Sequence, residues 1–406
     1  MRVSQVLASQ HIGWHFQQFW RTQGKRKIVD TGAAKILEKR GILVRDPHKE
    51  LKEKYTYEKI EVVGYIDKPQ AFDNTHPNWH SRPLLTYNDN NVLLEGLAQA
   101  KILTNSVEVK QGLPDAMELP KITKDFNRKV KDIILSTVLF DAEQKKLPKI
   151  KDSERPAWNF PRTYGITQPR VHKLLITKLL SLIEKTSSQD LVKNKYVSDD
   201  LYFSFPFERF GENIQFQLLG DIVLTSSEPL SVVSSDSTSE FELPDLAPIK
   251  PTISLTPENI YVMKDVYSIE RVAIKRHPHT LFVNFNKETV KNLYEEEVTA
   301  EQIYGRSLLK TFTAAAAYAK QTYGTNVKEL PTPVVLQCIQ SDGRLFYFGL
   351  LQLNTLDLES INIKNVWFQT PGLPLYEKCV YEVGRPVLHG YNDEVVRHFV
   401  AFYSNT

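Results

Sequence analysis

Two apolar runs that flank the dipeptide Asp342-Gly343 constrain the fold more than any other feature of this sequence. Both runs are rich in β-branched and aromatic residues, as strands are. An Asp-Gly pair between such runs fits the positive φ angles of a type I′ turn. We therefore predict a β-hairpin over residues 334–354.

The composition of the two arms also predicts where the hairpin lies and how its strands pair. Neither arm alternates apolar and polar residues, which is typical of strands inside a sheet that is covered on both faces. With a two-residue turn, Ser341 faces Arg344, and Ile339 faces Phe346. A β-branched residue at Gly343 would resist a positive φ and damage folding.

The remaining patterns predict an α+β protein, with a mixed, largely antiparallel sheet around this central hairpin and amphipathic helices covering it. Apolar residues at helical spacing predict helices over 91–105, 121–145, 168–185, from Thr299 to near Gly324, and from Asn392 onward. Thr299 and Gln302 match a capping box. Further strands are expected at 213–219, 221–225, 261–263, 279–285, 365–369 and 379–383.

The chain divides by composition into four parts. Residues 1–60 form a basic, irregular N-terminal extension, and 61–225 form the N-terminal part of a globular body in which 65–87 should be irregular. Residues 226–257 are acidic and rich in Ser and Pro, which predicts a linker or a surface excursion. Residues 258–406 complete the globular body and contain the hairpin.

Positive charge is concentrated near the N-terminus, although the 406-residue chain carries only +3 in total. Residues 1–45 contain nine Lys and Arg against two acids, which gives that segment +7. Residues 210–249 contain seven acids and no Lys or Arg. A polyanion such as RNA should therefore meet the basic arm and avoid the acidic segment. The arm residues expected to contact RNA are Arg21, Lys25, Arg26, Lys27, Lys35, Lys39, Arg40 and Arg45.

A second basic region is the loop over 148–165, where cations are interleaved with Trp158, Phe160 and Tyr164. Guanidinium groups can contact phosphates, and aromatic rings can stack on unpaired bases. The alternative is that the rings simply pin a surface loop to the core. The loop residues expected to contact RNA are Lys149, Lys151, Arg155 and Arg162.

The first 29 residues contain no acid. Val3, Leu7, His11 and Trp14 would lie on one side of a helix followed by several cations, which is how a mitochondrial presequence is built. A basic arm that binds RNA needs the same composition. The sequence therefore leaves both interpretations open.

The sequence contains no recognisable constellation for catalysis or metal binding. Phosphate-binding loops, a Gly-x-Ser-x-Gly elbow, paired Cys-x-x-Cys motifs and His-Glu-x-x-His are absent. His76 and His80 have a metal-like spacing, but Pro77 prevents a regular helix there, so we expect ordinary loop histidines. We predict no catalytic residue, no metal and no cofactor.

The two cysteines and the short apolar runs give two further predictions, one about a disulfide and one about a membrane span. Cys338 falls in a strand of buried type, so we expect a buried free thiol that is not bonded to Cys379. The apolar runs are far shorter than the ~20 residues that a membrane-spanning helix needs. The sequence therefore predicts no membrane span.

Several short segments in the C-terminal third carry a family resemblance through their order and spacing. Weaker matches at Leu93–Gly96 and Gly112–Pro114 extend it to nearly the whole chain past residue 55, although 226–257 and the first 50 residues depart from the pattern. The chain resembles the family of mitochondrial large-subunit ribosomal protein thirty-seven and, more distantly, the paralogous family of programmed cell death protein nine. The matching segments are Arg276–Phe282, Gln321–Thr325, Pro333–Gln337, Ser341–Arg344 and Leu351–Thr355.

This resemblance implies a structural constituent of the mitochondrial large ribosomal subunit, located in the matrix. It implies contacts with ribosomal RNA and with neighbouring ribosomal proteins, including a paralogous family member, and implies no catalytic residues, cofactor or small-molecule substrate. The competing hypotheses are an RNA-modifying or hydrolytic enzyme built from scattered polar residues, and a degenerate enzyme fold used as an adaptor. A convergent pocket with an acid or base of shifted pKa would favour an enzyme. An apolar patch beside a basic one would favour a scaffold.

Overall fold

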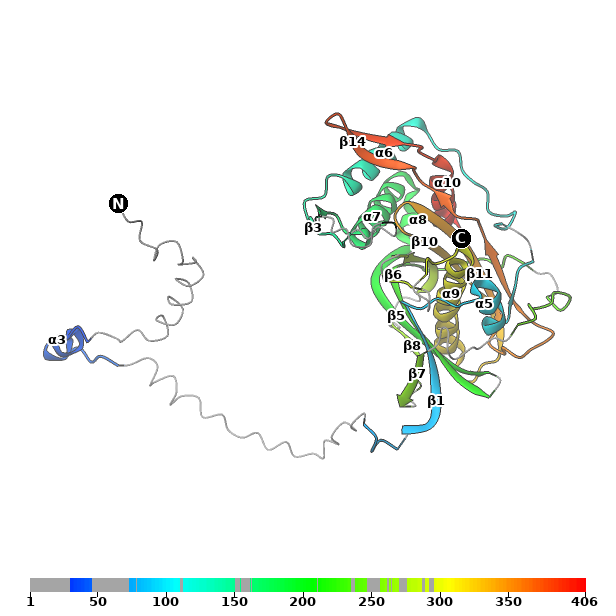
Figure 1. The fold of residues 1–406 in the computed structure, drawn as a ribbon, viewed down its shortest axis with the longest axis horizontal. Helices are drawn as coiled ribbons and strands as arrows, with labels where there is room; N and C mark the ends of the chain where they lie inside the picture. Colours follow the sequence, from blue (N-terminus) through cyan, green and yellow to red (C-terminus); the bar gives the residue numbers. More distant parts are fainter. Residues whose placement is uncertain are drawn as a thin grey trace. The chain divides into compact units, whose positions relative to one another are not determined.

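The computed structural model describes part of the chain, in two compact units, 1–69 and 70–406. In the first unit the described element is helix α3 (Ala33–Lys39), none of whose residues is buried. The second unit contains the sheet and the helices that cover it (Figure 1). The described residues are 30–45, 73–77, 79–109, 112–149, 154, 161, 163–209, 211–234, 238–246, 256–260, 263, 265–269, 276–286, 289–291 and 296–406.

The described strands of the second unit form one large sheet and two small two-stranded sheets, β14-β15 and β3-β4. The large sheet has the order β2-β12-β11-β10-β9-β6-β1-β7, with β5 and β13 pairing at β6 and β11, and β8 at β5. The strands are β1 (Trp79–Asn88), β2 (Ser106–Val107), β3 (Lys145–Lys146), β4 (Tyr164–Gly165), β5 (Lys195–Arg209), β6 (Glu212–Ser226), β7 (Thr256–Ile260), β8 (Val266–Tyr267), β9 (His277–Asn284), β10 (Glu329–Ser341), β11 (Leu345–Thr355), β12 (Asn365–Gln369), β13 (Leu373–Pro374), β14 (Lys378–Glu382) and β15 (Arg385–His389).

The pairing is mixed but largely antiparallel, so the predicted α+β class is confirmed. Parallel pairs occur between β1 and β6, between β9 and β10, and between β2 and β12. The predicted hairpin is the antiparallel pair β10-β11 at the middle of the sheet. The helices of this unit are α5 (Gly96–Thr104), α6 (Lys124–Val138), α7 (Gln168–Thr186), α8 (Gln189–Lys193), α9 (Ala300–Tyr323) and α10 (Asp393–Ser404).

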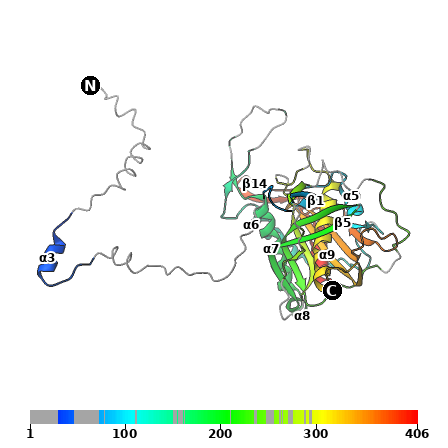
Figure 2. The same ribbon diagram turned by 90° about the horizontal axis from the view of Figure 1, so that it is seen from below.

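Helices cover both faces of the hairpin, as its unbroken apolar runs predict. On one face, Leu308 and Phe312 of α9 pack in the same core cluster as Leu336 and Leu351. On the other face, side chains of α7 and α10 pack in one core cluster with Ile339 and with other hairpin residues that point to this second face. Side chains that alternate along a strand point to opposite faces, so a strand between two helix layers needs apolar residues at every position. Figure 2 shows α6 and α7 side by side along this body.

Helix α9 is the central element of the first face, and its beginning and end agree with the sequence pattern. The capping box is present: Thr299 Oγ1 accepts from the N–H of Gln302, and Gln302 Oε1 accepts from the N–H of Thr299. The helix ends at Tyr323, with Gly324 as its C-cap at φ +104°. Nearly all of its residues up to Ala319 are buried, including the small residues 314–317 against the sheet.

The hairpin is where it was predicted, but its predicted turn is wrong. Ser341 pairs with Phe346, and Ile339 pairs with Phe348, which moves each partner by two residues. A type I′ turn requires positive φ at both central residues. Gly343 has φ +94°, whereas Asp342 does not have a positive φ. Each side chain still points to its predicted face of the sheet, because a register shift of two residues does not change the face.

The Asp342 side chain explains the longer turn. Its carboxylate accepts the N–H of Arg344 at 2.8 Å and the N–H of Leu345 at 2.7 Å. The hydroxyl of Ser341 accepts the N–H of Gly343 at 2.8 Å. These side-chain acceptors replace the backbone acceptors of a tight turn, which is the characteristic use of Asp and Ser in turns.

Strand β1 corrects the prediction that 65–87 is irregular. Leu84, Leu85 and Tyr87 are buried, and β1 pairs with β6 on one side and β7 on the other. Pro83 suggested a break, but the register with β7 shifts between Trp79 and Leu84, and such an irregularity can accommodate a proline. Residues before 73 within the predicted irregular stretch lie outside the described part.

Strand β6 corrects a second prediction, because the two strands expected at 213–219 and 221–225 are one strand. Gly220 lies between the two expected strands, and the single strand continues through it. A Cβ at Gly220 would lie 2.6 Å from a methyl group of Leu281, so this position needs glycine for close packing. The partner β5, which pairs with β6 along its whole length, was not predicted.

The other boundaries differ at their ends. The helix expected over 121–145 ends at Val138, and the one expected over 91–105 begins at Gly96. The strand expected at 261–263 lies mostly outside the described residues. Both cysteines are free and Cys338 is buried, as predicted, whereas no exposure was predicted for Cys379, which is half-buried.

The segment predicted as a linker or surface excursion crosses the sheet surface where it is described. Leu230 is buried in a cluster with Val335 and Leu350. The N–H groups of Val233 and Ser234 both donate to Oε1 of Gln352 at 2.9 Å. These described residues therefore pack against the sheet of the body.

Candidate nucleic-acid interface

The exposed face of α6 is rich in lysine and arginine. Apolar residues at helical spacing turn Val130 and Ile134 into the core cluster shared with α7 and α10, which leaves the charged positions facing outward. Thr123 caps the helix by accepting the N–H of Phe126 at 3.3 Å. The exposed cations on this helix and just before it are Lys121, Lys124, Arg128, Lys129 and Lys131.

Asp125 neutralises part of this charge. Its carboxylate lies 2.8 Å from Lys129 Nζ and 2.7 Å from Arg128 Nη2. The hydrogen bond from the Lys129 ammonium, assisted by Arg128, lowers the pKa of Asp125 below its ordinary value. Lys124 and Lys131 project beside this ion-paired group and line a groove.

The groove is shallow, has a volume of about 380 Å³, and lies between α6 and the start of α10. Tyr391 donates from its hydroxyl to Oδ1 of Asn127 at 2.7 Å, which fixes the ring against the helix. Lys131 Nζ lies 4.8 Å from the centre of that ring, within cation–π range. The lining residues are Lys124, Asn127, Arg128, Lys131, Tyr391 and Asp393.

This arrangement suits a single-stranded or looped polyanion. Three cations can meet phosphates, and a fixed tyrosine ring can stack on an unpaired base. Asp393 is the acid in the lining, and it also lies 3.5 Å from Arg397 on its own helix. The balance of the lining is therefore basic.

The twelve residues predicted to contact RNA divide between described and undescribed parts of the chain. Lys35, Lys39, Arg40 and Arg45 lie on or just after α3 and are exposed. Lys149 is exposed just after β3, close in sequence to the exposed Lys145 and Lys146. The remaining predicted residues, Arg21, Lys25, Arg26, Lys27, Lys151, Arg155 and Arg162, lie outside the described residues.

The α6 groove was missed at the sequence level. The spacing of Lys124, Arg128 and Lys131 was visible, but the helix was read only for its apolar side. Tyr391 and Asn127 are 264 positions apart in sequence, and no local pattern joins them. The signal that was available is the excess of Lys and Arg on the polar face of that one helix.

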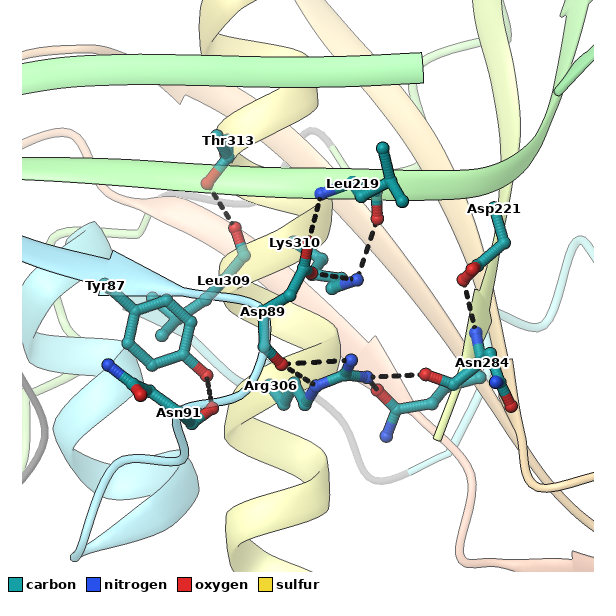
Figure 3. Close-up of polar contacts among 11 residues, drawn as sticks. Tyr87, Asp89, Asn91, Leu219, Asp221, Asn284, Arg306, Leu309, Lys310 and Thr313 are labelled. Atoms are coloured by element: carbon teal, nitrogen blue, oxygen red, sulfur yellow. Dashed lines mark hydrogen bonds and ion pairs between the residues drawn. The ribbon is translucent and has the colours of Figure 1, made fainter. Parts of the chain in front are cut away.

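A buried polar cluster occupies the point where β6 changes partner, and it is the clearest place to look for an active site. β1 pairs with β6 as far as Gln217, and β9 pairs with it from Ile222, so the carboxyl ends of β1 and β9 point toward each other there. Ligands often bind at such switch points. Here two cations from α9, Arg306 and Lys310, occupy it (Figure 3).

Oxygen atoms of the protein itself, from backbone carbonyls and from carboxylates, bind the charged groups at this junction. Lys310 Nζ forms an ion pair with Asp89 and donates to the carbonyl of Leu219 at 2.7 Å. Asp89 in turn accepts the N–H of Leu219 at 2.7 Å, and Asp221 accepts the N–H of Asn284 at 2.6 Å. Burial, with a smaller contribution from the nearby positive charge of Arg306, lowers the pKa of Lys310.

Arg306 completes this junction. Its guanidinium donates to the carbonyls of Asp89 and Asn284, at 3.3 Å and 3.1 Å, and to Oε1 of Gln340 at 2.9 Å. A cation saturated by acceptors from three strands ties the strand ends together. The arrangement is that of a structural clamp.

Other buried titratable groups also have neighbours that account for them. Lys195 Nζ lies 2.6 Å from Nε2 of His279 and donates to the carbonyl of Asn405 at 3.1 Å. Burial lowers the pKa of Lys195 to about 7 and, with the neighbouring lysine, that of His279 to about 3. Neither residue lines the α6 groove, so a shifted pKa and a pocket do not coincide there.

The described residues contain neither a metal-binding cluster nor a membrane-spanning helix. No group of three or more His, Cys, Asp or Glu side chains there is arranged to hold a metal ion. His76 is described, whereas the side chain of His80 is not. Within the same residues, none of the helices combines the length and apolar character needed to cross a bilayer.

Comparison with known proteins finds similarity to mitochondrial ribosomal proteins. Residues 273–406 match the family model described as mitochondrial 28S ribosomal protein S30 (PDCD9). This range contains β9, α9, the hairpin and α10, which contribute residues to the core clusters on both faces of the hairpin.

Individual relatives extend the similarity toward the N-terminus. The large ribosomal subunit protein mL37 of Mus musculus is 34% identical over 210 residues, which are 47% of this chain and about half (48%) of the mouse protein. The protein of the same name in Gallus gallus is 28% identical over 330 residues, covering 77% of this chain and 71% of the relative. That of Bos taurus is 27% identical over 347 residues, covering 81% and 76%.

The relatives share one name, and the matched family model covers the segments in which the sequence resemblance is concentrated. The alignments with the Gallus gallus and Bos taurus proteins cover 77% and 81% of the chain. The chain is thus similar to large ribosomal subunit protein mL37 of several vertebrates over most of its length, and its last third matches the PDCD9 family model.

Proposed function

We propose that this protein is a structural constituent of the mitochondrial large ribosomal subunit in the matrix, and that it supports mitochondrial translation by binding ribosomal RNA and neighbouring ribosomal proteins. The observation that carries the proposal is the similarity to proteins named mL37 over about four fifths of the chain. A paralogous family member is expected among the protein neighbours. The proposal includes no catalytic step and no cofactor.

The basic surfaces support the RNA-binding part of the proposal. Lys124, Arg128 and Lys131 line a groove with a fixed tyrosine ring, and Lys149 belongs to a second exposed basic stretch. The buried cations Arg306 and Lys310 are bound to the protein's own carbonyls, so they are engaged in holding the sheet together. RNA contact is therefore assigned to the exposed cations.

Sedimentation tests the assignment to the large subunit. The tagged protein, expressed in cells and followed through a sucrose gradient of mitochondrial lysate, should co-sediment with the large subunit and leave that position when the subunit is dissociated. A protein found only in the light fractions, while the large subunit remains intact, would contradict the proposal.

A charge variant tests the groove separately. Lys124→Gln combined with Lys131→Gln should weaken incorporation and lower the salt dependence of RNA binding by roughly one unit of slope per lost phosphate contact. The matched control, Lys185→Gln with Lys193→Gln, removes the same charge from exposed positions on α7 and α8. Equal incorporation of the two variants would exclude the α6 groove as an RNA contact.

A further inference from the structure

A larger groove lies at the end of α5, between the loop that joins β11 to β12 and the described residues 238–246. Its volume is about 610 Å³. Unlike the α6 groove, it has acids at its rim and apolar side chains inside. The lining residues are Asn105, Arg209, Ser239, Phe241, Glu242, Leu243, Leu358, Glu359, Ser360, Ile361 and Lys364.

One wall of the groove is held in place by Lys364. Its backbone N–H donates to Oγ1 of Thr238 at 2.9 Å, and its ammonium donates to the carbonyls of Ile361 at 2.6 Å and Thr238 at 3.3 Å. The side chain is only 5% exposed. The ammonium of this lysine is therefore bound to backbone carbonyls. These bonds hold the segment around Thr238 in place at the side of the groove.

Asn105 forms part of the floor and has an unused acceptor. The residue adopts the left-handed conformation, with φ 49°, at the end of α5. Its Nδ2 donates to the carbonyls of Asp357 and Ser360, at 3.3 Å and 3.0 Å. Its Oδ1 is buried and has no hydrogen-bond partner within the described part of the chain. Asn105 is 0% exposed, so this acceptor lies beneath the accessible surface of the groove.

The rim of the groove is acidic, and a large apolar side chain beside it is exposed to solvent. Glu242 and Glu359 line the groove, and Glu240 and Asp245 are exposed on the same wall segment. The cations in the lining, Arg209 and Lys364, are 3% and 5% exposed. Ile361 is 80% exposed beside the groove, which leaves a large aliphatic side chain in water.

We infer that this groove docks an extended, cationic segment of another protein, which inserts a bulky apolar side chain beside Phe241, Leu358 and Ile361. Lys or Arg side chains of the segment would meet the exposed Glu242 and Glu359. RNA is disfavoured, because the rim carboxylates repel phosphates. This inference rests on the proposed function in one respect: the partner is expected to be another protein of the large subunit.

Photo-crosslinking in assembled particles tests the inference. The full chain carrying Ile361→p-benzoylphenylalanine is incorporated into large subunits and irradiated, and the crosslinked product is sequenced by mass spectrometry. The expected product is a peptide of another protein with more Lys and Arg than Asp and Glu near the crosslink. Crosslinks to RNA, to a second copy of this chain or to a peptide without excess positive charge would overturn the inference, as would no crosslink.

Rim variants show whether charge governs the contact. Adding Glu242→Gln and Glu359→Gln should lower the crosslink yield at least fivefold, whereas the exposed control pair Glu118→Gln and Asp190→Asn should leave it unchanged. Equal yields in both pairs would overturn the charge argument. A chain that enters the subunit without this crosslink refutes the groove alone, while a chain that fails to enter refutes the proposed function.

Discussion

Gly96 and Gly305 meet where α5 crosses α9. A Cβ on Gly305 would lie 2.6 Å from the carbonyl oxygen of Gly96, and a Cβ on Gly96 would lie 2.5 Å from backbone atoms of Glu301. Neither obstruction is a flexible side chain, so the two helices can be this close only with glycine at both positions. The contact joins α5 to the central helix of the sheet's first face.

The variant Gly305→Ala should therefore destabilise the protein. Overpacking against backbone costs about 1–3 kcal/mol, which exceeds the gain of up to about 1 kcal/mol that alanine brings to a helix. Urea unfolding of the parent and the variant measures the difference. Gly165→Ala is the control, because its Cβ would meet side-chain atoms of Leu147, which can move, and no backbone. An equally stable Gly305→Ala protein would mean that the helices separate without cost.

The turn between β10 and β11 gives a second prediction. Asp342→Ala removes the acceptor of two backbone N–H groups, so we expect a loss of about 1–2 kcal/mol in the free energy of unfolding. Asp342→Asn keeps an acceptor oxygen and should recover most of that loss. Chemical denaturation of the three proteins decides the matter; if Asn and Ala are equally destabilising, the carboxylate bonds do not explain the turn.

Gly343 tests the same turn through its backbone. Its φ of +94° is unfavourable for any residue with a Cβ, and most of all for a β-branched one. Gly343→Val should therefore reduce soluble, folded protein more than Gly343→Ala does. The yield of folded protein and the urea midpoint report the order, and a stable Val variant would contradict it.

The elements that could be predicted from the sequence are those whose signals are local. The capping box at Thr299 and the glycine at 324 fixed the ends of α9, and the apolar runs fixed the hairpin. The turn was misassigned because the Asp342 side chain supplies acceptors that a propensity rule assigns to the backbone. β1 was missed because Pro83 interrupts its pattern, although tertiary pairing on both edges holds it in the sheet.

The α6 groove and the acidic groove could not be predicted for a different reason. Each joins residues far apart in the chain, as Asn127 and Tyr391 do across 264 positions. The floor of the acidic groove similarly combines Asn105 with the carbonyls of Asp357 and Ser360. Charge along the sequence indicates where cations are dense, but the pairing of strands decides which of them share a surface.

The pair Lys195 and His279 should make stability depend on pH. Folding lowers the pKa of Lys195 from 10.5 to about 7, so between these values the unfolded chain binds more protons than the folded protein. Stability should therefore rise with pH in this window, by about 1 kcal/mol between pH 7 and 8. Urea unfolding of the parent and of Lys195→Met at both pH values isolates this contribution, because the variant lacks the titrating amine. Identical pH dependence of the two proteins would show that Lys195 does not titrate there.

The acidic segment 210–249 should not contact RNA in the assembled particle. Its seven carboxylates have no lysine or arginine within the segment, and phosphates repel them. Ultraviolet crosslinking of large subunits, followed by mass spectrometry, should give RNA-linked peptides from 121–149 and none from 210–249. RNA adducts on the acidic segment would refute the charge argument.

The basic arm gives the last prediction, which separates an RNA anchor from a targeting sequence. Replacing Lys35, Lys39, Arg40 and Arg45 by Gln should weaken incorporation into the large subunit and make binding less sensitive to salt, because the lost contacts between cations and phosphates are the ones that salt screens. The isolated variant should stay folded, since α3 buries none of its residues. Replacing only Arg21, Lys25, Arg26 and Lys27 should impair mitochondrial import if they belong to a presequence, and incorporation after import if they bind RNA. A four-residue variant at 35–45 with the affinity and the salt dependence of the parent would show that this part of the arm anchors no RNA.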